Sequence, residues 1–260
     1  MPLLDQLQRT LTERQAKGML RNLTIHQPST LSSTSNLADF SSNDYLSIAT
    51  SSELKSHFIR RATLQESRVG GSTGSRLLDG NNGTGEMEDL ERRLCEFFKA
   101  QDGLLCPSGW EANVSLFSTL PQKDDVILYD SLVHASVHDG LRRSRAKCVS
   151  FQHNDVDDFQ SQLQTLVQSL PSHANVFLSI ESLYSMDGDY APLPQLLQVA
   201  RRYFPQGCGR FWTIIDEAHS GACFGPNGAG MTAQWGFTDE SQDIIRVMTF
   251  GKGFGASGGE

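Results

Sequence analysis

From residue 101 onward, short apolar runs alternate with longer stretches in which apolar residues recur every three or four positions. Short runs rich in Val, Ile and Phe are typical of buried strands, whereas the longer recurrence is typical of amphipathic helices. Because strands and helices alternate, we expect an α/β fold whose mostly parallel sheet is covered by helices on both faces. The pattern predicts strands at 103–106, 126–129, 148–151, 176–180, 211–215 and 244–250, and helices at 111–119, 136–143, 156–169 and 192–203.

The first hundred residues follow a different pattern. Leucines at helical spacing predict an amphipathic helix over 3–20, which is followed by a polar linker rich in Ser, Thr and Pro. A short strand is expected at 37–40, and one apolar face predicts a helix over 86–100. We therefore divide the chain into an N-terminal helix with its linker, 1–36, and one large domain, 37–260.

Three chemically reactive side chains stand at or just beyond the ends of two predicted strands. Asp216 and His219 follow the run 211–215, and Lys252 follows the run 244–250. Because the carboxyl ends of parallel strands meet at one edge of a sheet, we expect these groups to lie together. Pyridoxal phosphate (PLP) chemistry uses a lysine to bind the cofactor's aldehyde and a carboxylate to hold a proton on its ring nitrogen. Taken singly, Lys252 reads as a surface lysine and Asp216 as a helix cap.

Composition limits the classes of binding partner and the cellular compartments that suit this sequence. A net charge of -8 and a pI near 5.4 argue against a nucleic-acid surface. The five cysteines form no CxxC pair, which favours reduced thiols in an intracellular, most simply cytoplasmic, protein. No run is apolar enough to span a membrane or to act as a signal peptide, while mitochondrial and peroxisomal locations stay open.

Several further motifs stand in order along the chain, and together they carry a resemblance. They read FSSNDYL (40–46), SGWEAN (108–113), HAS (134–136), HND (153–155), YSMDGD (184–189), APL (191–193), DEAHSG (216–221) and TFGKGFG (249–255). A chain with this series resembles the α-oxoamine synthases, PLP-dependent acyltransferases of the fold-type I aminotransferase superfamily. The resemblance runs from about Leu4 to Gly259, and a departure at Trp110, where many members carry another aromatic residue, is local.

The resemblance implies a role for each matching residue. Lys252 would bind the cofactor covalently, Asp216 would hold its ring nitrogen, and His219 would contact its phenolic oxygen. His134 would stack on the ring, and these four residues would be catalytic. The implied cofactor contacts are Gly109, Trp110, His134, Ser185, Asp216, His219, Thr249 and Lys252, and the implied substrate contacts are Arg21 and Asn43.

Simpler readings stand beside some of these roles. Arg21 also reads as a solvated arginine at a helix end, and Ser185 as ordinary turn chemistry. His134 and His138 are spaced like a zinc pair, but no third ligand is spaced to help, so no metal site is expected.

Two glycine-rich stretches are set aside. The G-x-G-x-x-G pattern at 253–258 lacks the following helix and acid of a dinucleotide site. The run at 70–75 lacks the P-loop lysine, and the resemblance makes it part of the active-site architecture.

The resemblance also implies a reaction and partners. The expected reaction condenses L-alanine with a pimeloyl thioester (of coenzyme A or a carrier protein) with loss of CO2, in biotin synthesis, in a homodimer. Other members of the family use other amino acids and acyl chains, and a non-catalytic PLP-fold protein is a further alternative. The family continues past the lysine into a C-terminal domain, so we expect this chain to be shortened, poorly soluble and inactive alone.

Overall fold

The computed structural model describes residues 2–22, 39–64, 85–237 and 243–260. It divides into two units, Met1–Ser42 and Asn43–Glu260, and each is described by itself. The predicted linker, and the glycine run at 70–75, lie outside the described residues.

Within the described residues of the first unit, helix α1 spans Leu3–Ala16. The predicted helix 3–20 ends early because Gly18 adopts a left-handed conformation (φ 65°) and the amide of Met19 bonds the carbonyl of Arg14 (2.8 Å). The strand predicted at 37–40 is wrong where the structure describes it. There the carboxylate of Asp39 accepts from the amides of Ser41 and Ser42, which makes a turn.

The second unit is built on a sheet in which every described strand pairing is parallel. The strand order is β2-β1-β3-β4-β5. The bounds are β1 Val126–Asp130, β2 Lys147–Phe151, β3 Val176–Glu181, β4 Phe211–Asp216 and β5 Ile244–Val247. The predicted α/β fold and parallel sheet are confirmed.

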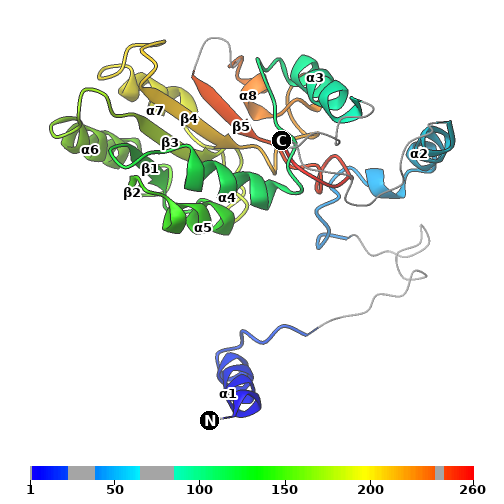
Figure 1. The fold of residues 1–260 in the computed structure, drawn as a ribbon. Helices are drawn as coiled ribbons and strands as arrows, with labels where there is room; N and C mark the ends of the chain where they lie inside the picture. Colours follow the sequence, from blue (N-terminus) through cyan, green and yellow to red (C-terminus); the bar gives the residue numbers. More distant parts are fainter. Residues whose placement is uncertain (1, 23–38, 65–84, 238–242) are drawn as a thin grey trace. The chain divides into compact units, whose positions relative to one another are not determined.

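Helices cover both faces of this sheet (Figure 1). Alternate strand residues face opposite ways, so Leu128 and Leu178 pack in one core cluster while Ile127 and Phe177 pack in the other. The first cluster lies under α6 (Val156–Val167) and α7 (Leu193–Ala200), and the second under α4 (Gly109–Thr119) and α5 (Ala135–Arg143).

Some predicted boundaries are corrected by the structure. The stretch 103–106 forms no strand: Cys106 makes only an isolated antiparallel bridge to Gly259. Helix α4 begins at Gly109 rather than at 111, because Ser108 caps it by accepting from the amide of Glu111 (3.2 Å).

The remaining described elements are α2 (Ser52–Leu64), α3 (Glu86–Phe98), α8 (Met231–Gln234) and two 3-10 turns at Ile48–Thr50 and Pro226–Gly228. Helix α2 was not among the predicted elements, and α3 ends two residues short of the predicted 86–100. No helix in the described part of the chain is long and apolar enough to cross a membrane.

Candidate active site

A pocket opens where β3 and β4 end, between the start of α4 and the loop after β5. Polar and charged side chains from distant parts of the sequence meet here, as the strand-end pattern predicts. Its lining residues are Gly109, Trp110, Asn113, His134, Ser136, Glu181, Asp216, Ala218, His219, Thr249 and Lys252.

Asp216 is the last residue of β4 and is 7% exposed. Its Oδ1 accepts from the amide of Ala218 (2.9 Å), and its Oδ2 accepts from Nδ2 of Asn113 (2.8 Å). Nδ2 of Asn113 also donates to Oγ of Ser136 (3.0 Å), so α4 and α5 together fix the carboxylate. A buried carboxylate held by two donors suits a protonated ring nitrogen as its third contact.

Lys252 is the first residue in a series of hydrogen bonds that begins in the pocket. Its Nζ lies 2.7 Å from Nε2 of His219, whose Nδ1 lies 2.6 Å from Oη of Tyr45. The hydroxyl of Tyr45 donates to Oδ1 of Asn43 (3.3 Å), which leaves its oxygen to accept from His219. This series of hydrogen bonds therefore begins at the Lys252 amine, which donates, and ends at the side-chain oxygen of Asn43, which accepts.

The ionisation of Lys252 and His219 follows from their surroundings. Burial lowers the pKa of Lys252, and the charge of Asp216 opposes that shift. Burial, followed by the charge of Lys252, lowers the pKa of His219 to about 4, so its imidazole is neutral at pH 7. A neutral His219 accepts a hydrogen bond from the Lys252 amine at Nε2, so its Nδ1–H is the donor toward Tyr45.

The start of α4 forms a ready anion site. Gly109 and Trp110 are its first residues, so their amides have no acceptor within the helix, and both residues line the pocket. Thr249 lies against this end: a Cβ built on Gly109 would meet the Thr249 hydroxyl oxygen at 3.1 Å. These groups suit a phosphate.

His134 occupies the pocket wall at the start of α5. Its Nδ1 lies 2.7 Å from Oγ of Ser136, and its ring meets Trp110 edge-on with centroids 5.5 Å apart. Burial lowers its pKa, which favours the neutral ring. His138 points elsewhere and packs edge-on against Tyr129, and no group of three metal-ligating side chains gathers within the described residues.

Two polar residues that line the pocket, Asn113 and Glu181, were not among the predicted site residues. Asn113 positions Asp216, and Glu181 ends β3 directly beside it, since Glu181 and Asp216 are partners in the β3–β4 register. The same strand-end signal that singled out Asp216 applies to Glu181. Tyr45 does not line the pocket, but it links Asn43 to His219 and is a third residue near the site that was not predicted.

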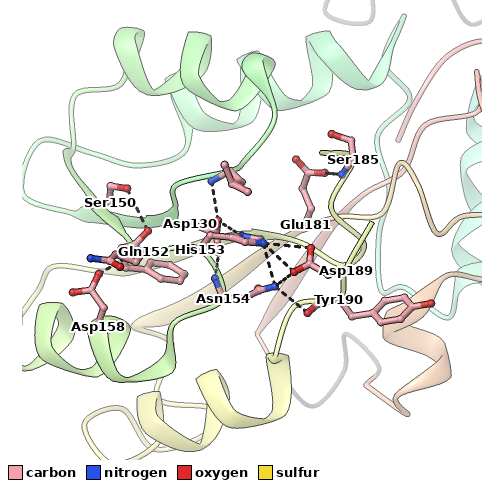
Figure 2. Close-up of polar contacts among 12 residues, drawn as sticks. Asp130, Ser150, Gln152, His153, Asn154, Asp158, Glu181, Ser185, Asp189 and Tyr190 are labelled. Carbon is pink, nitrogen blue, oxygen red and sulfur yellow. Dashed lines mark hydrogen bonds and ion pairs between the residues drawn. The ribbon is translucent and has the colours of Figure 1, made fainter. Parts of the chain in front are cut away.

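Two predicted site residues of this unit do not line the pocket. Ser185 is exposed on the loop after β3, where its amide donates to Oε2 of Glu181 (3.2 Å; Figure 2). Asn43 contributes through Tyr45. Arg21 is exposed and belongs to the other unit, so its role stays a prediction.

The loop that carries Ser185 is held by a partly buried histidine (Figure 2). His153 places Nδ1 2.9 Å from the fully buried carboxylate of Asp130 and Nε2 3.0 Å from the carboxylate of Asp189. Its ring also meets Tyr184 edge-on at 4.5 Å. Burial works to lower the pKa of His153, but the hydrogen bonds and charges of the two aspartates outweigh it and raise that pKa.

Stability should therefore depend on the protonation of His153. A raised pKa in the folded state means that the stabilisation is present at low pH and is lost as pH rises through the folded-state pKa. We expect His153→Gln to lower the free energy of unfolding by about 2 kcal/mol near pH 6 and by less near pH 9. Thermal melts across that range test this.

His173→Gln is the matched control for that series. His173 also pairs with an aspartate, Asp124, but their side chains are 71% and 57% exposed. An exposed pair contributes little, so the melting temperature should barely move. If His153→Gln lowers the free energy of unfolding equally at pH 6 and at pH 9, the stabilising role of a protonated His153 is contradicted.

The pocket fits PLP on observations of its own. An amine at Lys252 suits an aldehyde, Asp216 suits a ring nitrogen, and the start of α4 with Thr249 suits a phosphate. Two buried oxygens in the pocket, Oδ1 of Asn113 and Oε1 of Glu181, have no partner among the described residues. Fold and pocket together define the class: a large domain of the fold-type I PLP-dependent proteins.

Comparison with known proteins agrees with this class. The family model for aminotransferase class I and II matches residues 35–259, so the chain belongs to that family. The 8-amino-7-oxononanoate synthase of Emericella nidulans is 40% identical over an alignment 264 residues long, which covers 98% of this chain and 60% of that protein.

Solved structures show the same likeness. Serine palmitoyltransferase from S. paucimobilis, with bound PLP, superposes with a TM-score of 0.69 at 30% identity, over 84% of this chain and 50% of that one. An 8-amino-7-oxononanoate synthase from Francisella tularensis gives 0.63 at 25% identity, over 86% and 57%. The chain thus spans about half to 60% of the length of these relatives.

Proposed function

We propose that this chain is the cofactor-binding part of an α-oxoamine synthase, a PLP-dependent enzyme that joins an amino acid to an acyl thioester. The observation that carries this is the meeting of Lys252, His219 and Asp216 in one pocket beside the open start of α4. Transaminases and other PLP enzymes need the same lysine and carboxylate. The named relatives support the acyltransferase branch.

The residues divide the work. Bound PLP would supply an electron-withdrawing ring that stabilises negative charge at the amino acid's α-carbon. Asp216 holds the proton on the ring nitrogen, and Asn113 keeps Asp216 in place. Lys252 is positioned to take the proton from the α-carbon, because its lowered pKa increases the share of free amine. Neutral His219 orients that amine from Nε2.

The finer assignment is L-alanine with a pimeloyl thioester, carried by coenzyme A or a carrier protein, giving 8-amino-7-oxononanoate, CO2 and the free thiol. The names of two relatives support it. Arg21 and Asn43 would bind substrate, and a homodimer would be the working form. The alternative is a serine palmitoyltransferase-like or glycine acetyltransferase-like reaction, which the other structural relative favours.

A substrate matrix tests the assignment. PLP-loaded protein, completed with the C-terminal domain that the family carries past the lysine, is offered alanine, glycine or serine, each with a short, a pimeloyl or a long acyl thioester, and thiol release is measured. We expect alanine with the pimeloyl thioester to give the highest kcat/KM. A preference for serine with a long chain would move the protein to the sphingoid-base branch. Thiol release with none of the nine pairs would contradict synthase activity in this chain.

A further inference from the structure

Two glutamates are almost fully buried near the pocket, and their surroundings are opposite. Glu217, which follows β4, accepts at Oε2 from the Met231 amide (2.8 Å) and from Oγ of Ser182 (3.0 Å). It accepts at Oε1 from the Thr232 amide (2.8 Å), and the hydroxyls of Ser220 and Thr232 add further bonds. Both oxygens of this carboxyl group are therefore satisfied by donors.

Glu181 is 2% exposed and has far fewer donors. Its Oε2 accepts from the Ser185 amide (3.2 Å), while its buried Oε1 has no hydrogen-bond partner among the described residues. Glu181 is one of the residues that line the pocket. An ionised carboxylate with a bare buried oxygen is costly, whereas a protonated one has a donor to offer.

The neighbour of Glu181 makes ionisation harder still. Asp216 sits opposite it in the β3–β4 register, and two adjacent carboxylates cannot both ionise cheaply. Asp216 has the better donors, from Asn113 and Ala218. Burial, and then the charge of Asp216, raises the pKa of Glu181 to about 8, against the opposing effect of the Ser185 and His134 amides and of Lys252. The pair therefore divides into an anion at Asp216 and an acid at Glu181.

We propose that Glu181 is kept as a neutral carboxylic acid and donates a hydrogen bond from Oε1 to a negatively charged oxygen of the molecule bound in this pocket. This rests on the proposed function, in which that molecule is PLP with its amino acid. The oxygen belongs either to the PLP ring or to the amino acid's carboxylate. Glu181 is thereby a second acid beside Asp216, with the opposite protonation.

The first test needs no cofactor. A folded-state pKa raised above the unfolded value costs stability as pH rises from about 4.5 toward 8, because the unfolded chain releases its proton first. Glu181→Gln removes that cost, so its melting temperature should exceed that of the wild type at pH 8 and approach it near pH 5. Glu217→Gln is the matched control, since it replaces a carboxyl group whose oxygens are both satisfied and should lower the melting temperature throughout.

The second test measures PLP binding by absorbance titration. Glu181→Leu should lower the affinity for PLP, or the affinity of the PLP-loaded protein for alanine, by about tenfold, the value of one lost hydrogen bond. The titration that changes identifies the oxygen. Glu181→Gln, which keeps a donor, should recover most of that loss. The wild-type affinity should fall as pH rises past about 8, and the Gln variant should lack that fall.

The outcomes separate this inference from the proposed function. If the wild type binds no PLP, the proposed function fails, and the melting curves still decide whether Glu181 is protonated. If PLP binds but Glu181→Gln behaves like Glu181→Leu, or if Glu181→Gln melts at or below the wild type at pH 8, the neutral acid is wrong.

Discussion

Replacing Lys252 with alanine should abolish the covalent capture of PLP and lower turnover by about 10³-fold or more. In the wild type, borohydride should fix the cofactor permanently on Lys252, where peptide mass spectrometry would find it. The loss follows because Lys252 supplies the only amine among the described residues that line the pocket, and it is also the group placed to move the α-carbon proton. PLP bound by the alanine variant should instead be removed by dialysis.

Lys252→Ala also allows a second measurement, the pKa of His219, which does not depend on turnover. The charge of Lys252 helps to lower the pKa of His219, so that pKa should rise when the amine is removed. Titration of the His219 ring by NMR would show it. Lys147→Ala, at an exposed position on β2, is the control and should keep both borohydride labelling and the His219 titration. Labelling that persists in Lys252→Ala would place the reactive amine elsewhere.

Much of the sheet could be predicted because its strands are short, apolar and separated by amphipathic helices. Strand β3 is buried at all six positions, and such a run is hard to read in another way. The stretch 103–106 looks similar in sequence, yet it forms only the bridge from Cys106 to Gly259. Whether an apolar run becomes a strand depends on a neighbour to pair with, and a local pattern contains no such information.

The candidate site was predictable where strand ends alone determine position. Asp216 and Lys252 stand at or just past the ends of adjacent strands, and the structure brings them together with His219. The contacts that depend on long-range packing were not predictable in this way. Asn113 reaches Asp216 across 103 residues of sequence, and Tyr45 reaches His219 across 174.

Glu181 shows a different limit. Its position at a strand end marks it as clearly as Asp216, so its presence at the site could have been expected. Its protonation could not, because that follows from an oxygen without a partner among the described residues and from the register that sets Glu181 opposite Asp216. Sequence indicates which titratable groups gather at an edge, and the packing decides which of them keeps its proton.

Replacing Asp216 with asparagine should slow the exchange of the alanine α-proton by about 10²- to 10³-fold while changing PLP affinity much less. The amides of Gly109 and Trp110 that would bind the phosphate remain, but the ring nitrogen would lose the anion that keeps its proton. An asparagine that presents its oxygen to the Ala218 amide also turns its own NH2 toward Nδ2 of Asn113, setting two donors against each other.

Deuterium exchange into alanine, followed by NMR on PLP-loaded protein, measures the effect, and absorbance titration measures the affinity. Removing the negative charge should also lower the pKa of Lys252 further, because Asp216 is the largest influence that raises it. Asn113→Ala is the companion variant: it keeps the anion but removes its support, so its exchange rate should fall between those of the wild type and Asp216→Asn. Equal exchange rates in the wild type and Asp216→Asn would remove Asp216 from its catalytic role.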